Sequence, residues 1–432
     1  MSEDAMKTYD NTRSGELFER AASVIPGGVP GHLGPAEGCY MPIKDYPIFT
    51  AKADGAYFWD VDGNRYIDYM CAYGPNILGY NDPDVDAAAA AQAKVANCTQ
   101  NPTPLLIELA ELMVDTIAMA DWAFFAKNGG DVTAFALMIA RAATGRDKVV
   151  LTRGGYHGVA PWMQGFGSPG VTQADVSNNL YMDFGDVAQF ERYVAEHRGR
   201  IAAFFSTPYH HPVFDDNRTP PEGYWQRIRE ICTREGIVLV IDDVRAGFRL
   251  DVAGSDAHYG FEADLTAYCK ALANGHNISA LCGTDALKEA AASVMYTGSY
   301  WMSAVPMAAA IACVRKMREI DSAEVCLKTG RRLTEGLVDA AATNGFDLRI
   351  SGEPSMWFLR TTAMDGEPDD NYLLHQAWVA ECVRRGVFFT NHHNLFINTA
   401  MSEEDLLFTF DVADAAFRSV RSRARSILTP QL

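Results

Sequence analysis

Short apolar runs alternate with helical segments between about residues 105 and 285. Four of these runs are "DKVVLT", "IAAFFS", "GIVLVID" and "ISALCG", each bounded by glycine or polar residues. Strand-like runs that alternate with helices predict a mostly parallel sheet with helices on both faces. Open sheets of this kind bind ligands at the carboxyl ends of their strands, so the loops that leave those ends are the candidate sites.

The two ends of the chain predict a smaller α+β part beside this α/β domain. Residues 56–69, "AYFWDVDGNRYIDY", have the alternation and the "DGN" turn of a hairpin. Two helical segments, 307–319 and 324–344, precede short strands and a helix near 403–424. The predicted divisions are 1–70 for an N-terminal segment and part of the small domain, 71–310 for the large domain, and 311–432 for the C-terminal small domain.

Charge and cysteine content exclude several classes of function. A formal net charge of −18 argues against a nucleic-acid or anionic-membrane partner, which needs a basic surface. The nine cysteines are scattered without a C-x-x-C, and the "HH" pairs at 210–211 and 392–393 lack the i, i+4 spacing of a helical metal site. We therefore expect no metal centre. The polar N-terminus and the lack of a long apolar run predict a cytoplasmic protein.

The segment "KNGGDV", residues 127–132, joins an apolar run to a helical segment. Asn128, Gly129 and Gly130 could converge their backbone N–H groups on an anion, at the positive end of the following helix. The alternative is a simple strand-to-helix turn capped by Asp131. Because neither G-x-G-x-x-G nor a Walker sequence is present, the segment gives no support for a dinucleotide or nucleoside triphosphate.

Two charged residues lie where apolar runs end. Asp242 closes "GIVLVID", and a carboxylate so far inside needs a cation, such as a protonated pyridine nitrogen. A helix cap or a salt bridge to Arg245 or Arg249 is the alternative. Lys270, in "AYCKALANG", is a candidate nucleophilic amine with a lowered pKa, or a surface lysine with a buried stem.

The loop "YHGVAPWMQG", residues 156–165, adds an aromatic ring and an imidazole. Pyridoxal phosphate (PLP) requires the combination found here: phosphate donors, a stacking ring, an acid for the pyridine nitrogen and an amine for the aldehyde.

The chain resembles the class III aminotransferases of PLP fold type I, in the branch of the glutamate-1-semialdehyde aminomutases. The resemblance runs from "PGGV" (26–29) to the C-terminal helix. It is carried, in the family's order, by "AYFWDVDGNRYIDY", "ARAATGRDKVV", "GGYHG", "IDDVRAGFR" and "KALANGHNISALCG". It implies a seven-stranded, mostly parallel sheet in the large domain and a homodimer with its active sites at the interface.

The resemblance also implies a role for each matching residue. Lys270 would form the Schiff base, Asp242 would pair with the pyridine nitrogen, and Tyr156 and Val244 would pack on opposite faces of the ring. Gly129 and Gly130, next to Asn128, would bind the phosphate, and His157 would position its loop. Thr297 or Ser299, in "TGSYWMSAVPM", would reach the phosphate of the partner subunit.

The chain departs from the family pattern near the substrate. An arginine that often follows "PGGV" and binds a substrate carboxylate is missing, and His32 lies nearby instead. The segment "FFTNHHNLFINTAM" lacks the family's glutamate. Both departures argue against glutamate-1-semialdehyde as the substrate. Tyr73, His392 and His393 are the candidate pocket residues, although Tyr73 could be core packing and the two histidines a surface turn.

The implied reaction is amino transfer from an amine or amino acid to an oxo acid, by way of the Lys270 Schiff base. An aminomutase or racemase, which returns the amino group to the same molecule, is the alternative within the same chemistry. A silent PLP-binding regulatory protein is the alternative of another class. The presence of Lys270, Asp242 and Tyr156 together argues against that second alternative.

Overall fold

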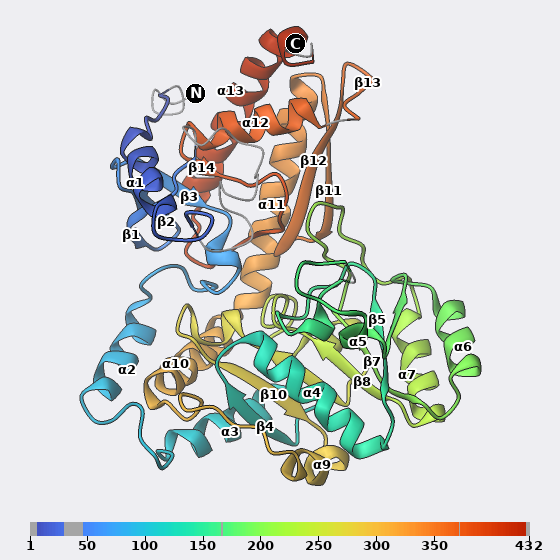
Figure 1. The fold of residues 1–432 in the computed structure, drawn as a ribbon. Helices are drawn as coiled ribbons and strands as arrows, with labels where there is room; N and C mark the ends of the chain where they lie inside the picture. The colour runs from blue at the N-terminus through green and yellow to red at the C-terminus, as the bar shows by residue number, and fades with distance from the viewer. Residues whose placement is uncertain (1–6, 30–45, 166, 371, 429–432) are drawn as a thin grey trace.

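The computed structural model describes residues 7–29, 46–165, 167–370 and 372–428. A large sheet with its helices forms the lower part in Figure 1, and two small sheets with their helices form the upper part. The large sheet has seven strands in the order β4-β10-β9-β8-β7-β5-β6. The strands are β4 (Trp122–Ala126), β5 (Lys148–Thr152), β6 (Asn179–Met182), β7 (Ile201–Ser206), β8 (Val238–Asp242), β9 (Leu265–Tyr268) and β10 (Ser279–Gly283).

The predicted mostly parallel α/β sheet is confirmed. Strands β6, β5, β7, β8 and β9 pair in parallel, whereas β10 is antiparallel to both of its neighbours, β9 and β4. Every residue of β7, β8, β9 and β10 is buried, which is why these runs are apolar without alternation.

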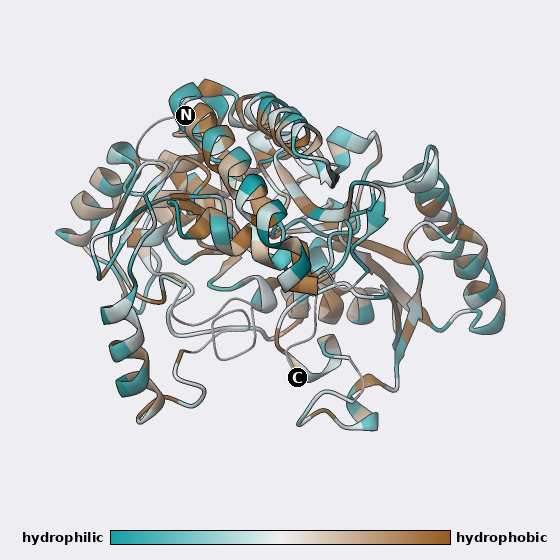
Figure 2. Ribbon diagram, turned by 90° about the horizontal axis from the view of Figure 1, so that it is seen from above, coloured by the Kyte–Doolittle hydropathy of each residue, from teal (hydrophilic) through white to brown (hydrophobic). Residues whose placement is uncertain are grey.

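Helices cover the large sheet on both faces. Phe205 of β7 lies in the same cluster as Phe135 of α4 (Gly129–Thr144), whereas its neighbour Phe204 points to the other face and packs on Phe190 of α6 (Val187–Glu196). Helix α7 (Tyr224–Glu235) lies on the α6 side. Teal and brown residues alternate along the helices at the right edge of Figure 2, as expected for helices with one buried face.

The remaining helices of the lower part are shorter or lie at its edge. Helix α10 packs on α2, on α3 and on the short helix η6 that begins at Lys270. These helices are α2 (Pro83–Ala93), α3 (Leu105–Thr116), α5 (Gln173–Val176), α8 (Ser255–Tyr259), α9 (Lys288–Ser293), α10 (Ala304–Ile320), and the 3-10 turns η4 (Cys71–Tyr73), η5 (Pro161–Met163), η6 (Lys270–Ala273) and η7 (Asp285–Leu287).

Both ends of the chain build the upper part. Strand β14 (Val387–Phe388) pairs in parallel with β3 (Arg65–Asp68), so an N-terminal strand and a C-terminal strand share one sheet. The other elements are α1 (Thr12–Ala22), β1 (Thr50–Asp54), β2 (Tyr57–Asp60), α11 (Ser322–Thr343), β11 (Phe346–Glu353), β12 (Met356–Met364), β13 (Glu367–Pro368), α12 (Leu373–Val383), β15 (Leu395–Phe396) and α13 (Glu403–Leu428). The predicted hairpin corresponds to β2 and β3. The boundaries predicted at 70 and 310 stay predictions.

The packing of the core predicts that truncating a buried side chain lowers the free energy of unfolding far more than truncating an exposed one. Replacing the fully buried Phe204 by alanine should lower the free energy of unfolding by about 3–5 kcal/mol, because it leaves a cavity between the sheet and α6. The measurement is urea denaturation followed by circular dichroism. The matched control is Val24→Ala, at a side chain that is 79% exposed and should change stability by less than about 0.5 kcal/mol. Equal losses in the two variants would contradict this account of the core.

Candidate active site

A cavity of about 590 Å³ lies at the carboxyl ends of the large sheet. Residues that follow β4, β5, β7, β8 and β9 all line it, as the general rule for open sheets predicts. The predicted residues that the structure brings together there are Asn128, Gly129, Gly130, Tyr156, His157, Asp242, Val244 and Lys270.

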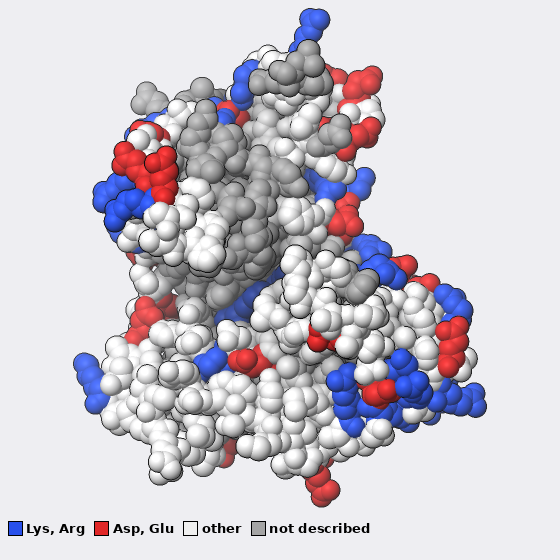
Figure 3. All heavy atoms as spheres, viewed as in Figure 1, with Lys and Arg blue, Asp and Glu red and all other residues white. Residues whose placement is uncertain are grey.

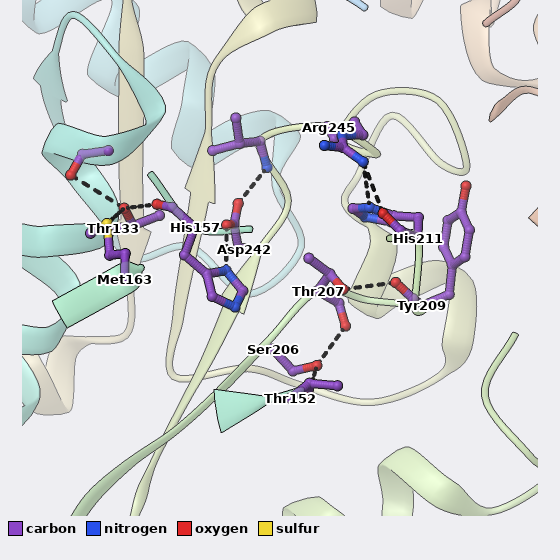
Figure 4. A network of polar contacts seen from close by, with 12 residues as sticks. Thr133, Thr152, His157, Met163, Ser206, Thr207, Tyr209, His211, Asp242 and Arg245 are labelled. Carbon is purple, nitrogen blue, oxygen red and sulfur yellow. Dashed lines mark hydrogen bonds and ion pairs between the residues drawn. The ribbon is translucent and has the colours of Figure 1, made fainter. Parts of the chain in front are cut away.

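Asp242 ends β8 inside the protein and is only 4% exposed. Its Oδ2 lies 2.7 Å from Nδ1 of His157, and its Oδ1 accepts a hydrogen bond of 3.1 Å from the backbone N–H of Val244 (Figure 4). The alternative salt bridge is wrong: within the described chain neither Arg245 nor Arg249 forms an ion pair with this carboxylate. The carboxylate is therefore oriented by an imidazole and a backbone N–H, and no lysine or arginine of the described chain pairs with it.

His157 is held from several sides. Its backbone oxygen accepts a hydrogen bond of 2.7 Å from Oγ1 of Thr133, and its ring meets Phe205 edge-on at 4.8 Å. Its Nε2 is buried and has no hydrogen-bond partner among the described residues. With Asp242 ionised, the Nδ1 proton of His157 is donated to it, so the imidazole fixes the direction of the carboxylate.

Lys270 follows β9 as the first residue of η6, with a left-handed φ of 37°. Burial, and next the positive charge of Arg245, lower the pKa of its amine to about 7, against the opposing pull of Asp242. Its Nζ makes no hydrogen bond or ion pair with any residue that the structure describes. At neutral pH and above, a large part of this amine is unprotonated and can act as a nucleophile.

Glycines bring three segments close together beside the start of α4. A Cβ on Gly129 would lie 2.8 Å from Cγ1 of Val244, and a Cβ on Gly158 would lie 2.8 Å from Cα of Gly130. Asp131 accepts hydrogen bonds from the backbone N–H groups of Lys127 and Asn128, so the predicted cap is also present. The 16-residue helix α4 thus points its N-terminus into the cavity without side chains in the way, which suits a phosphate group.

These residues fit PLP. The start of α4 can receive the phosphate, the buried Asp242 can face a protonated pyridine nitrogen, and Lys270 can react with the aldehyde. Val244 and the half-exposed ring of Tyr156 also line the cavity and can flank a planar ring. Burial raises the pKa of Tyr156 above its usual value, so the phenol keeps its proton.

Thr297 and Ser299 are exposed and do not line this cavity. Thr297 instead borders a second, apolar groove of about 420 Å³ that includes Ile107, Phe124 and Trp301.

The structure separates the predicted substrate residues. The ring of His393 meets the ring of Tyr73 edge-on at 5.3 Å, and Arg245 and Lys270 are among the groups that lower its pKa. The pair is therefore near these two cavity residues, although neither Tyr73 nor His393 lines the cavity itself. His392 turns the other way, with its ring 5.3 Å from that of Phe214.

The backbone around Tyr73 has an unusual conformation. Tyr73 ends a run of three left-handed residues with Cys71 and Ala72, a strained backbone of the kind found beside functional sites. His32 lies outside the described residues.

Several cavity residues escaped the sequence analysis. Arg245, His211, Thr207 and Cys269 all line the cavity. From the sequence, Arg245 is a candidate only for a salt bridge to Asp242, and His211 is only one member of an "HH" pair. The available indication was their position, since both follow buried strands at the edge of the sheet where ligands bind.

Comparisons with known proteins identify the family of this chain. Residues 40–416 match the family model of the class III aminotransferases. An aminopentol aminotransferase from Sphingopyxis macrogoltabida is 38% identical over 95% of both chains, and a glutamate-1-semialdehyde 2,1-aminomutase from Chlorobium luteolum is 31% identical over 92% of this chain and 94% of its own. The solved FumI protein of a Sphingopyxis species, in its PLP internal aldimine form, superposes with a TM-score of 0.91 at 38% identity, covering 96% of this chain and 98% of that one.

The chain therefore belongs to the class III aminotransferases, which are enzymes that use PLP. Its similarity to a named aminotransferase covers nearly the whole chain, so amino transfer between an amine and an oxo acid is its class of reaction. Among the described residues, none of the helices has the length and apolar content needed to cross a membrane.

The lowered pKa of Lys270 predicts how its reactivity depends on pH. In the cofactor-free protein, the rate of acetylation of Lys270 by trace acetic anhydride should rise through about pH 7 and level off above about pH 8, because the unprotonated amine reacts. Peptide mass spectrometry measures the labelling, with the exposed Lys288 as the internal reference. A Lys270 reactivity that goes on rising up to about pH 10 would contradict the assignment.

Proposed function

We propose that this enzyme transfers an amino group from a hydroxylated amine without a carboxylate to an oxo acid, with Lys270 as the residue that binds PLP covalently. The observation that carries the proposal is the combination of an unpaired amine of lowered pKa and a buried, oriented Asp242 in one cavity. When bound, PLP supplies an electron sink for the pair of electrons left when a C–H bond next to the amine is broken.

The residues of the chain have separate roles in the proposed reaction. Asp242 keeps the pyridine nitrogen protonated, and His157 fixes the direction of that carboxylate. The amine of Lys270, neutral near pH 8, takes the proton from the substrate carbon and returns it as a general base and acid. The amides at the start of α4, at Gly129 and Gly130, bind the phosphate.

The proposed donor follows from uncharged polar side chains in and near the cavity, which are His211 on its wall and the pair of His393 and Tyr73. Burial and then Arg245 hold the pKa values of His211 and His393 well below their usual range, so both rings are neutral at physiological pH. Neutral imidazoles and a phenol can exchange hydrogen bonds with hydroxyl groups. The name of the 38% identical relative refers to an aminopentol, an amine with several hydroxyl groups, and this supports a donor of the same class.

An aminomutase is the second candidate, since relatives at 31% identity carry that activity in their names. The two functions differ in their need for an acceptor. With a hydroxylated primary amine as the only substrate, an aminotransferase should transfer one amino group to each bound cofactor. The reaction should then stop until pyruvate or another oxo acid is added. Chromatography of the products measures the outcome. Sustained isomerisation of the amine without an oxo acid would favour the aminomutase instead.

The assignment of Lys270 can be tested against a neighbouring lysine. Lys127 is also buried, with a pKa lowered by burial and with no hydrogen-bond partner for its Nζ among the described residues. Borohydride reduction of the holoenzyme followed by peptide mass spectrometry should place PLP on Lys270 alone. Lys270→Ala should lose this modification and lower the transfer rate by about 10⁴-fold or more, while Lys127→Ala keeps the modification. PLP found on Lys127 would refute the assignment.

We further propose that the active enzyme is a homodimer in which Thr297 and Ser299 reach the phosphate of the partner's cofactor. Apolar side chains are exposed near this loop, including Met295 at 89% and also Tyr300, Ile107 and Val95. Figure 3 shows mostly uncharged side chains on the left and middle of the lower part of the molecule, whereas charged side chains gather on its right. An exposed apolar area of this kind is typical of an interface.

Mixed dimers test whether Ser299 acts in the partner's site. Ser299→Asp should repel the phosphate and inactivate the enzyme, as Lys270→Ala does by another route. Subunits of the two variants, combined into one dimer, should regain up to about half of the wild-type activity, because one of the two sites then receives both native residues. No recovery in the mixed dimer would mean that Ser299 serves its own subunit or neither.

A further inference from the structure

Arg245 is a buried guanidinium on the cavity wall. It lies in the turn after β8, three residues beyond Asp242, and is only 7% exposed. Its Nη1 donates a hydrogen bond of 2.9 Å to the backbone oxygen of His211 and lies 3.2 Å from Nδ1 of the same residue (Figure 4). Across the described parts of the chain these are its only hydrogen bonds, so Nε and Nη2 have no partner.

No carboxylate of the described chain lies within ion-pair distance of this charge. Arg245 forms no ion pair with any described Asp or Glu, and Asp242 is oriented toward His157 instead. The groups that act electrostatically on Arg245 are Asp242, Tyr209 and Tyr156, and two of them are phenols. A guanidinium stays charged in proteins, and keeping it buried without a partner is costly. An anion in the cavity would remove that cost.

The neighbouring groups leave the charge of Arg245 available to a ligand. His211 and His393 are neutral because their pKa values lie well below the usual range, by burial first and Arg245 second. Arg245 is also the second cause, after burial, of the lowered pKa of Lys270. The two cations therefore lie close enough to interact, which places an anion on Arg245 beside the reacting amine.

We infer that Arg245 binds the carboxylate of the oxo acid acceptor, and of the amino acid formed from it. This inference rests on the proposed function, because it assigns a binding residue to the second half-reaction, in which the oxo acid accepts the amino group. The planar fork of a guanidinium matches a carboxylate with two parallel hydrogen bonds. A carboxylate held next to Lys270 belongs to an acid whose oxo group is on the adjacent carbon. Arg245 would thus replace the arginine missing after "PGGV".

The first test measures binding without turnover. Propanoate should bind the resting wild-type holoenzyme in calorimetry, and propanamide, which has the same shape without the charge, should bind at least about tenfold more weakly. Arg245→Gln should weaken the binding of propanoate by about 10²-fold or more, as expected when one partner of a buried charged pair is removed. Equal binding of the two ligands by the wild type would overturn the inference, whatever the transfer activity.

The second test compares pyruvate with pyruvamide as acceptors for the amino form of the enzyme. Arg245→Gln should lower kcat/KM for pyruvate about 10²-fold more than it lowers kcat/KM for pyruvamide, because only pyruvate carries a carboxylate. Equal losses for the two acceptors would mean that Arg245 acts through Lys270 or the cofactor, and would overturn the inference. Absence of transfer by the wild type, with propanoate still bound through Arg245, would refute the proposed function alone.

Two further variants separate recognition from folding. Arg245→Lys keeps a positive charge without the fork and should retain an intermediate preference for pyruvate. Arg249 is the matched control, because it is equally buried but donates its hydrogen bonds to the backbone oxygens of Ile397 and Gly74, and it does not line the cavity. Arg249→Gln should leave the ratio of pyruvate to pyruvamide unchanged. A ratio that falls as far in Arg249→Gln as in Arg245→Gln would contradict a specific role for Arg245.

Discussion

The buried carboxylate of Asp242 is the constraint on which the rest of the site depends. A charge that is 4% exposed at the end of an all-buried strand is costly unless it is hydrogen-bonded and faces a cation. The structure supplies the hydrogen bonds through His157 and the backbone of Val244, but no lysine or arginine partner from the described chain. A protonated pyridine ring would satisfy that requirement, and the glycines proposed to bind its phosphate and the Lys270 proposed to react with its aldehyde line the same cavity.

The cavity also holds a second buried charge, that of Arg245, which forms no ion pair with any described Asp or Glu and is opposite in sign to that of Asp242. In the proposed reaction Asp242 pairs with the cofactor, which takes part in both half-reactions. Arg245 pairs with the carboxylate of the oxo acid, which takes part in only one of them. The neutral His393 and the nearby Tyr73 suit hydroxyl groups. Such a division would let one cavity accept an uncharged amine and an oxo acid in turn. It also explains how the enzyme can lack the arginine that usually follows "PGGV".

Much of the fold could be predicted from the sequence, because the apolar runs and the "DGN" turn are local signals. The same is true of Asp242 and Lys270, since each lies at the end of a buried strand. The directions of neighbouring side chains could not be predicted. His392 and His393 are adjacent but point to Phe214 and to Tyr73, and Arg245 turns to His211 while Arg249 turns to backbone oxygens. These directions depend on packing between segments far apart in the chain, which periodicity does not record.

The protonation state of the cofactor's pyridine nitrogen tests the central claim most directly. Nitrogen-15 NMR of holoenzyme reconstituted with labelled PLP reports it without any substrate. The account predicts a protonated nitrogen in the wild type at about pH 8, and loss of that proton in Asp242→Asn with the cofactor still bound. An unprotonated nitrogen in the wild type, or the same spectrum in both proteins, would contradict it.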